Sequence, residues 1–350
     1  MTGLENIMQS DALAEVDFYL PSMTLSEYLR DVVPAHPLLG SALDFARPGA
    51  EKALRLLTTT TTEFDSDDTG RGDSYRRAQR DSSVRWRGVR QLLELAAEST
   101  PERPCTVLDV LGGDGTIARA VHEHAADLHD RFGILTGDLS GEMVAQALAQ
   151  GLPAVRQAAD HLFLGDRTVD AVLLAYGTHH IAPDDRLSAV TEALRVVRPG
   201  GRVVLHDFDE SSPMADFFTR IVHPYTTAGH DYPHFSRTLL NELFEEAGAP
   251  ADVVDFYDPL IVHGETEEDA RRRMCDYVAD MYGVGSFFDT LGGTDACWHV
   301  LEQHFGHERY LASLPDRVDF TPGPVVYRSH DTYVAEVPRA AIVAIAQKAA

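Results

Sequence analysis

Apolar runs alternate with segments of helical periodicity across the middle of the chain. Short apolar runs at 107–110, 133–138, 169–176 and 203–207 predict buried β-strands. Between them, segments such as 117–128 and 184–197 carry apolar residues at helical spacing. This order predicts an α/β fold, in which helices cover both faces of a parallel sheet.

The first 100 residues are predicted to be helical. Helical spacing occurs at 23–33, 50–57 and 84–97, and either Ser22 or Thr24 is a candidate N-cap for the first of these. A polar, glycine-containing run at 63–73 predicts a surface loop. Two roles are open for that loop: a lid over a bound ligand and a plain linker.

Beyond residue 210 the pattern becomes less regular. Helices are expected at 236–247, 266–282 and 294–305, and strands at 253–263 and 325–337. We expect the two strands to form a hairpin that completes the sheet, and the segments 211–235 and 264–320 to roof the site. The resulting division of the chain is a helical lid or dimerisation region at 1–100, an α/β domain at 101–265, a helical insertion at 266–320 and the last strand or strands at 321–350.

A glycine-rich turn follows the first strand, in the sequence VLDVLGGDGT at 107–116. Glycines at 112, 113 and 115 allow a tight turn and a close approach of the backbone to a ligand. Asp138 ends the second strand, 29 positions after Asp109, and an acid there suits a ribose diol. A pyrophosphate is disfavoured, because the turn lacks the G-x-G-x-x-G spacing and Asp109 and Asp114 would repel it.

The order of these landmarks over about 105–265 resembles the class I S-adenosylmethionine (SAM)-dependent methyltransferases. The resemblance implies a Rossmann-like methyltransferase sheet, with an N-terminal helical region and helical lid insertions. It also implies a SAM site, with the glycine turn at the methionine part and the second-strand acid at the ribose, formed by Asp109, Gly112, Gly113, Gly115, Asp138 and Leu139.

Two positions depart from the family's pattern. Leu111 stands where the family often has glycine, and Ala158 stands where it often has an acid for the adenine amino group. Asp160, two residues further on, or the backbone is expected to take the second role.

Composition limits the partners of the protein. The 350-residue chain is 44% hydrophobic and carries a formal net charge of −25, which argues against binding to nucleic acid or to an anionic membrane. Its three cysteines have no paired spacing, and the sequence has neither a signal-peptide pattern nor an apolar run of membrane-spanning length. We therefore expect a cytoplasmic enzyme with a small-molecule substrate, for which a homodimer is a candidate assembly.

Seven of the 16 histidines fall between residues 179 and 263. His179 and His180 follow the third recognised strand, His206 and Asp207 end the next, and His230 and His234 lie in the expected roof. Ligands of open α/β sheets bind beyond the carboxyl ends of the strands, so these side chains are expected near the SAM methyl group. Hydrogen-bonded structural histidines, general acid–base catalysis and a metal site for Zn, Fe, Co or Ni are all open.

A narrower resemblance favours the metal. The phrases LLAYGTHHI, LHDF, SPMADFFTRIVHPYTTAGHDYPHF and DYVADMYG are similar to bacterial α-keto acid C-methyltransferases, including the 2-ketoarginine methyltransferase type. The resemblance implies histidine ligands on the strand end and the roof, here His179 or His180, and His230 or His234, of which His179 and His230 are the predicted ligands. Position alone adds His206 as a candidate ligand. His180, Asp207 and His234 are candidates for the base.

The implied reaction is methylation of the β carbon of a 2-oxo acid, in amino-acid or peptide natural-product biosynthesis. A divalent metal would stabilise the enolate as a Lewis acid. One alternative is a metal-free methyltransferase that uses a histidine base at carbon, nitrogen or oxygen of an aromatic natural product such as an indole or a phenol. Another is a protein of this fold that binds SAM without transferring its methyl group.

Overall fold

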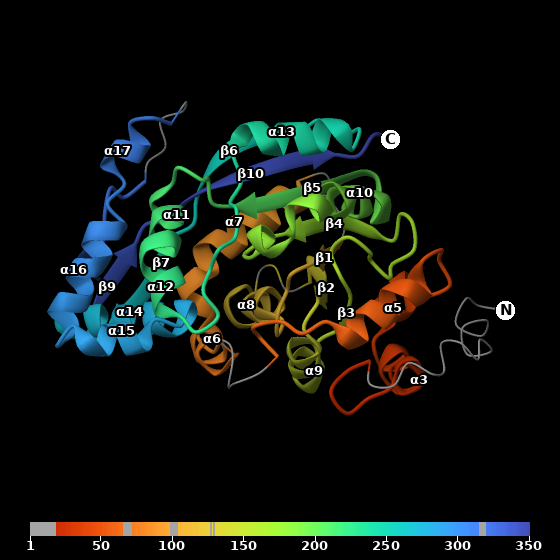
Figure 1. Cartoon of the computed structure of the whole chain (residues 1–350), viewed down its shortest axis with the longest axis horizontal. Helices are drawn as coiled ribbons and strands as arrows, with labels where there is room; N and C mark the ends of the chain where they lie inside the picture. The colour runs from red at the N-terminus through yellow and green to blue at the C-terminus, as the bar shows by residue number, and fades with distance from the viewer. Residues whose placement is uncertain (1–18, 66–71, 99–103, 127, 129, 315–319) are drawn as a thin grey trace.

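The computed structural model describes residues 19–65, 72–98, 104–126, 128, 130–314 and 320–350. Its centre is a seven-stranded sheet in the order β3-β2-β1-β4-β5-β10-β6 (Figure 1). The strands are β1 Cys105–Asp109, β2 Phe132–Asp138, β3 Ala154–Arg156, β4 Val169–Leu174, β5 Val197–Asp207, β6 Asp252–Tyr257 and β10 Ala340–Gln347. Strands β1 to β5 pair in parallel, and β10 runs antiparallel between β5 and β6. The predicted α/β class is confirmed.

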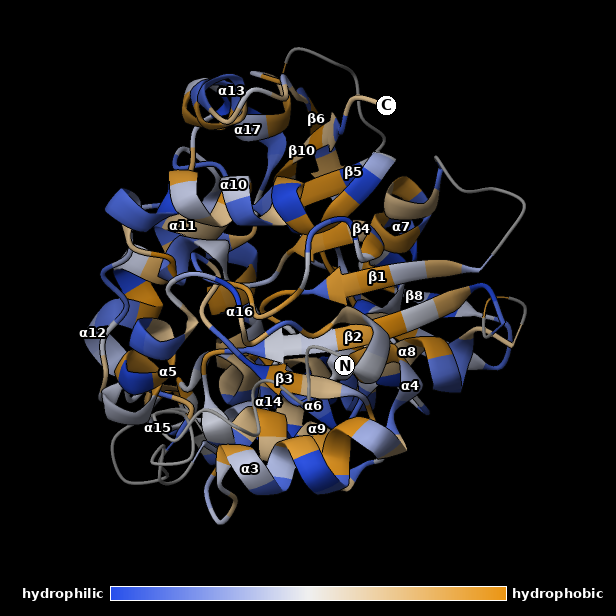
Figure 2. Ribbon diagram, turned by 90° about the vertical axis from the view of Figure 1, so that its right-hand side faces the viewer, coloured by the Kyte–Doolittle hydropathy of each residue, from blue (hydrophilic) through white to orange (hydrophobic). Residues whose placement is uncertain are grey.

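Helices cover both faces of this sheet. On one face lie α7 Trp86–Ala97 and α8 Thr116–His124. On the other lie α9 Gly141–Ala149, α10 Arg186–Val196 and α13 Arg237–Glu246. In Figure 2, β4 and β5 are coloured mostly hydrophobic, whereas the surface helices show both colours. The continuous apolar runs of the central strands therefore reflect burial on both faces.

The first N-terminal helices pack beside the β3 edge of the sheet. They are α3 Leu25–Glu27, the π-helical turn η1 Tyr28–Val32, η2 Val33–Ala35, α4 Pro37–Ala42 and α5 Ala50–Thr59. Two later elements lie elsewhere: α6 Gly72–Gln79 packs against α14 Glu267–Tyr282, and η3 Ser82–Arg85 packs against α8. Thr24 caps α3 in a capping box with Glu27, as one of the two predicted caps. The hydroxyls of Tyr19 and Tyr28 donate to the carbonyls of Arg156 and Ala154, each at 2.7 Å. These bonds tie the leading region to the edge strand.

Short helices connect the strand ends on the roof side of the sheet. They are η4 Thr178–His180, η5 Pro183–Asp185, α11 Pro213–Phe217, the π-helical turn η6 Phe218–Val222 and α12 His223–Tyr225.

A second, three-stranded antiparallel sheet lies beside the main one, at the left of Figure 1. Its order is β7-β9-β8, with β7 Leu260–Gly264, β8 Val325–Ser329 and β9 Thr332–Val337. It is accompanied by α14 Glu267–Tyr282, α15 Gly285–Thr290, α16 Thr294–His304 and α17 Glu308–Leu311. Within the described parts of the chain, no helix combines the length and the apolar character needed to cross a bilayer.

The expectation that 253–263 and 325–337 complete the main sheet is confirmed only for the part that forms β6 and is wrong for the rest, which pairs in the small sheet. The predicted strand 253–263 is interrupted at Asp258 and Pro259, so that β6 belongs to the main sheet and β7 to the small one. Proline cannot donate to a strand ladder, and the Asp258 side chain is fully buried in an ion pair with Arg339. The strand that completes the main sheet is β10, whose residues from 340 to 344 are buried.

A buried glycine lets Asp258 approach helix α7. A Cβ atom at Gly88 would lie 1.9 Å from the Asp258 Oδ1 atom. We therefore expect Gly88→Ala to lower the free energy of unfolding by about 1–3 kcal/mol through overpacking. A Cβ atom at Gly285 would meet nothing within 4 Å, so Gly285→Ala is the matched control, with an expected change below about 1 kcal/mol. Denaturant unfolding measures both, and equal stabilities of the two variants would contradict the prediction.

Candidate active site

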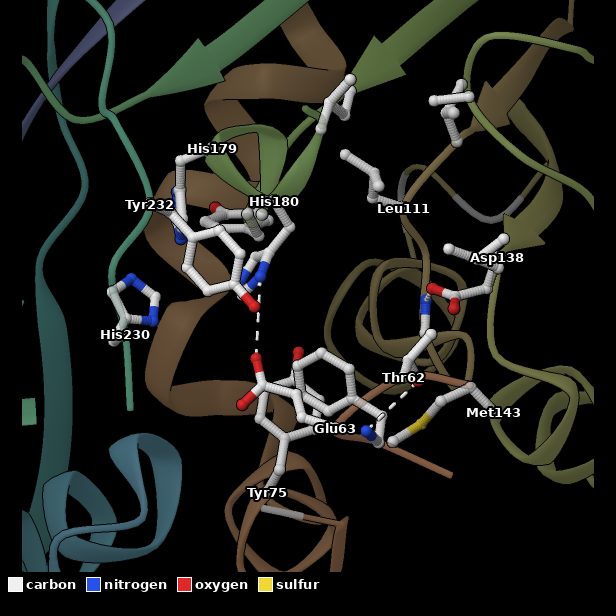
Figure 3. A pocket seen from close by; sticks show the side chains of 18 of the residues that line it. Thr62, Glu63, Tyr75, Leu111, Asp138, Met143, His179, His180, His230 and Tyr232 are labelled. Atoms are coloured by element: carbon white, nitrogen blue, oxygen red, sulfur yellow. Dashed lines mark hydrogen bonds and ion pairs between the residues drawn. The ribbon is translucent and has the colours of Figure 1, made fainter. Parts of the chain in front are cut away.

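A cavity of about 460 Å³ opens at the carboxyl ends of the parallel strands, where open α/β sheets bind ligands. Figure 3 shows its two sides, with His179, His180, His230 and Tyr232 on one and Leu111, Asp138 and Met143 on the other. Further lining residues come from the segment 61–64, from α6, η6 and α14, from the segments after β3 and β4, and from two buried arginines. Among them are Glu63, Tyr75, Arg85, Ala158, Asp160, Tyr176, Phe218, Met281 and Arg339. One cavity thus joins the predicted cofactor side to the histidine side.

The glycine turn shapes the cofactor side. Gly113, with φ of +57°, lines the cavity, and its N–H donates to the Asp138 Oδ2 atom at 2.8 Å. Gly112 and Gly115 do not line it. A Cβ atom at Gly112 would lie 2.8 Å from the Asp109 carboxylate, and one at Gly115 would lie 2.4 Å from Leu152. These two glycines therefore allow the turn to pack closely, and Gly113 is the glycine of the turn that lines the cavity.

Asp138, Leu139 and Asp160, three of the residues predicted to bind the cofactor, line the cavity. The Asp138 carboxylate accepts hydrogen bonds from the backbone N–H groups of Gly113 and Ser140, each at 2.8 Å. Burial, together with the nearby charges of Asp65 and Asp114, raises the pKa of Asp138 to about 6 despite these bonds. Ala158 and Leu111 also reach the cavity wall, so the two departures from the family's pattern lie where a ligand would touch them.

Asp109 was expected to bind the cofactor, but the structure places it beneath the turn. Its side chain is buried and does not line the cavity. Burial raises the pKa of Asp109 to about 8, and the negative charge of Asp138 adds to the rise. The Asp109 carboxyl group therefore packs against the glycine turn on the side away from the cavity.

Ligand binding on the cofactor side should depend on pH. Because the pKa of Asp138 is raised to about 6, the ionised acceptor is present above pH 6 and is lost as the pH falls through 6. We expect the dissociation constant of S-adenosylhomocysteine (SAH) to rise about tenfold per pH unit below 6. Calorimetry from pH 5 to 8 measures this. The Asp138→Asn variant should lose the dependence, while a step confined to about pH 8 would implicate Asp109 instead.

The histidine side gathers three rings from two segments. His179, His180 and His230 each offer one ligand atom, and these atoms lie within 4.8 Å of one another. The Phe218 ring stacks on His230 with centroids 4.1 Å apart, and the Tyr232 ring lies 4.3 Å from that of His180. Three imidazoles at this spacing fit a borderline divalent ion such as zinc. Of the predicted ligands, the structure brings together His179 and His230, and His180, the alternative at the strand end, lies with them.

Asp207 holds His179 in place. The Nδ1 atom of His179 lies 3.0 Å from both Asp207 oxygens, and Asp207 also accepts from the backbone N–H groups of His179 and Phe208. Burial alone would raise the pKa of Asp207, but His179 and His234 hold it well below its usual range. Such a carboxylate orients a histidine ligand and is a poor base.

His234 and His206 lie away from the cavity wall. The His234 Nδ1 atom is 3.4 Å from Asp207, and His179, Asp207 and His234 form a second group of candidate ligand atoms behind the first. His206 is fully buried, with Nε2 3.7 Å from the Asp258 carboxylate, and it belongs to neither group of candidate metal ligands among the described residues. The roles predicted for His206 as a ligand and for Asp207 and His234 as bases therefore lack support from the geometry.

The segment 61–64 brings a carboxylate that the sequence did not single out. Glu63 lines the cavity, and its Oε1 atom lies 3.6 Å from the His180 Nδ1 atom (Figure 3). The next acid, Asp65, accepts a hydrogen bond from the hydroxyl of Ser140 on the cofactor side. The described part of the predicted loop is thus a strap across the cavity, joined to both of its sides.

Two buried arginines line the cavity beside Tyr176. Arg339 pairs with Asp258 and donates to the Tyr282 hydroxyl at 3.2 Å. The Cζ atom of Arg85 lies 4.7 Å from the centre of the Tyr176 ring. Sequence reasoning assigns neither to the site, because Arg85 stands with Arg87 and Arg90 in a run typical of a solvated helix face and Arg339 belongs to no pattern.

Comparisons with known proteins relate the segment that forms the cofactor side of the cavity to methyltransferases. Residues 108–205 match the sequence profile of a family described as methyltransferase domain. The chain is 33% identical over 110 residues to the ubiquinone/menaquinone biosynthesis C-methyltransferase UbiE of Brucella anthropi, covering 30% of this chain and 41% of that protein. It is 34% identical over 133 residues to the demethylmenaquinone methyltransferase of Thermus thermophilus, covering 36% and 56%. The chain thus aligns with about half the length of these relatives.

Solved structures with a similar fold have lower identity. The YcgJ protein of Bacillus subtilis is 17% identical, with a TM-score of 0.45, over 75% of this chain and 99% of that one. A phosphoethanolamine N-methyltransferase 2 of Haemonchus contortus in complex with SAM is 14% identical, with a TM-score of 0.47, over 84% and 61%.

Proposed function

We propose that this chain is a SAM-dependent C-methyltransferase that methylates the β carbon of a 2-oxo acid. The profile match over 108–205 and the names of the relatives support methyl transfer from SAM. The single observation that supports a 2-oxo acid as the methyl acceptor is the cluster of His179, His180 and His230 in the same cavity as Asp138. A methyltransferase that needed only one base would not require three imidazoles within 4.8 Å of one another.

The residues of the cofactor side fit SAM. When bound, SAM supplies an electrophilic methyl group on a sulfonium ion. Asp138 presents a carboxylate for the ribose hydroxyls, and the absence of a side chain at Gly113 leaves the wall open there. Leu139 and Ala158 offer apolar contacts, and Asp160 is the acid within reach of the adenine. The segment 61–64, which crosses the cavity, would exclude water from this side.

The residues of the histidine side fit a divalent ion. His179, His180 and His230 would hold it, with Asp207 orienting His179 through Nδ1. When bound, such an ion supplies a Lewis acid for a 2-oxo carboxylate group. Carbon next to a ketone becomes a nucleophile only after losing a proton, so the chain must also supply a base. Glu63, at the cavity wall beside His180, is the carboxylate we assign to that role.

The relatives favour a second candidate. One is named a C-methyltransferase of ubiquinone/menaquinone biosynthesis and the other a demethylmenaquinone methyltransferase, and both names are compatible with an aromatic acceptor and no metal. The alignments cover only about a third of this chain, and the histidine cluster is the observation that favours the 2-oxo acid.

Metal content and proton exchange together test the proposal. The purified chain should contain close to one equivalent of a divalent metal, and chelation should abolish its activity. With SAH in place of SAM, the wild type should accelerate exchange of the β protons of phenylpyruvate in D2O over the spontaneous rate, and His263→Ala, at an exposed histidine, should do the same. Full activity of a metal-free enzyme on an aromatic acceptor would instead establish the second candidate.

A further inference from the structure

Arg85 is a buried cation whose charge no carboxylate balances directly. It is the last residue of η3, immediately before helix α7, and only 6% of its surface is exposed. Its guanidinium donates to the amide oxygen of Gln79, and among the described residues no carboxylate lies within ion-pair distance of it. Burial of an unpaired charge is costly, so a buried guanidinium usually has an anionic partner.

The nearest acids are engaged elsewhere. Asp258 interacts with Arg85 only at longer range, because its Oδ2 atom pairs with Arg339 and its Oδ1 atom accepts from the Tyr176 hydroxyl at 3.3 Å. Asp109 also lies near Arg85, but burial raises its pKa to about 8, so this group is mostly uncharged at neutral pH. Neither acid supplies the missing partner.

The guanidinium of Arg85 is available to a ligand. Arg85 and Arg339 line the same cavity as Gly113 on the cofactor side and His179 on the histidine side. Tyr176, whose ring lies against Arg85, adopts a φ of +60°, a backbone conformation that is uncommon for non-glycine residues. A planar guanidinium presents paired donors that match a carboxylate.

We propose that Arg85 binds a carboxylate of a ligand in this cavity. The inference rests on the proposed function, under which two ligands carry a carboxylate that a guanidinium can bind. One is the methionyl part of SAM, and the other is the 2-oxo acid acceptor. Arg339 is excluded from this role by its pairing with Asp258. Arg85 is therefore a binding and orienting residue, and the reacting atoms lie elsewhere in the cavity.

Calorimetry on the full chain tests the assignment with three probes. SAH carries the methionyl carboxylate, 5′-methylthioadenosine lacks the amino-acid part, and phenylpyruvate, titrated into SAH-loaded protein, represents a 2-oxo acid. We expect Arg85→Gln to weaken either SAH or phenylpyruvate roughly 10- to 100-fold, the effect of losing a hydrogen bond to a charged group, and to leave methylthioadenosine unchanged. Loss of SAH affinity identifies the methionyl carboxylate, and loss of phenylpyruvate affinity identifies the acceptor.

Controls separate binding from folding. Arg90→Gln, at a partly exposed arginine that lies on the following helix α7 and pairs with Glu94, should bind all probes like the wild type. If Arg85→Gln does not fold, Arg85→Lys carries the test, with a smaller loss of affinity because lysine lacks the paired donors. Arg85 variants that fold and bind both SAH and phenylpyruvate within about twofold of the wild type would overturn the assignment. A wild type that binds SAH but no 2-oxo acid would refute the proposed acceptor, while the SAH titration would still decide the role of Arg85.

Discussion

Replacing His179 with alanine should reduce methyl transfer about 100-fold or more and remove any bound divalent metal. His179 is the one residue that belongs to both groups of candidate ligand atoms. Its ring is fixed by Asp207, so its loss removes a positioned donor. Turnover with saturating SAM and metal analysis of the purified variant measure the two effects, and the dissociation constant for SAH should remain within about twofold of the wild type.

Neighbouring histidines provide controls for this result. His230→Ala should behave like His179→Ala, because His230 completes the group at the cavity wall. His234→Ala should retain most of the metal, because His234 contacts Asp207 behind the cavity. The reverse pattern, with metal lost from His234→Ala and kept by His230→Ala, would assign the ion to the second group.

Replacing Asp138 with asparagine should weaken SAH binding about 100-fold. The carboxylate offers acceptors to the ribose and orders the turn through Gly113, so the variant loses both functions. The fold should survive, because burial and nearby acids already oppose ionisation of this side chain. Calorimetry at pH 7.5 measures the affinity, and Asp252→Asn, at an exposed acid on β6, is the matched control.

A modest effect would contradict the assignment of the cofactor side. If Asp138→Asn binds SAH within about threefold of the wild type, the ribose is held elsewhere. Asp160→Asn would then be the next variant to examine, because Asp160 also lines the cavity.

The sequence predicts the central sheet well because burial on both faces leaves long apolar runs. The runs at 107–110, 133–138 and 169–176 correspond to β1, β2 and β4, and the glycine turn lies where a ligand would bind. Strand β3 escapes prediction because only three of its residues pair. Strand β10 lies within 321–350, where the last strand or strands are expected, but at 340–347 and not at 325–337, because local pattern does not reveal which of the late apolar runs reaches the main sheet.

The site is less predictable because its residues converge from distant segments. The position after β4 suggests His179 and His180, which the structure places at the cavity wall together with His230 from the roof. The pattern cannot distinguish these rings from His206, whose side chain points into the buried interior beside Asp258. Asp207 looks like a base in the sequence, and only its four hydrogen-bonded neighbours, Thr178, His179, Phe208 and His234, reveal a supporting role.

Glu63 and Arg85 illustrate the same limit. Glu63 lies in a polar run typical of a surface loop, and its position in the cavity depends on contacts across the sheet to His180. Arg85 lies in a sequence with Arg87 and Arg90 that is typical of a solvated helix face, yet it is buried. Tertiary packing decides which member of such a set faces the site.

Product analysis tests the central claim most directly. The purified, metal-loaded chain is incubated with SAM and a panel of 2-oxo acids with aliphatic, aromatic and guanidino side chains, alongside indole and phenol acceptors. Mass spectrometry and NMR then locate the added methyl group. The account predicts one added CH2 at the β carbon of a 2-oxo acid, in a reaction that His179→Ala does not support. Methylation only of an aromatic acceptor, at full rate in metal-free enzyme, would contradict it.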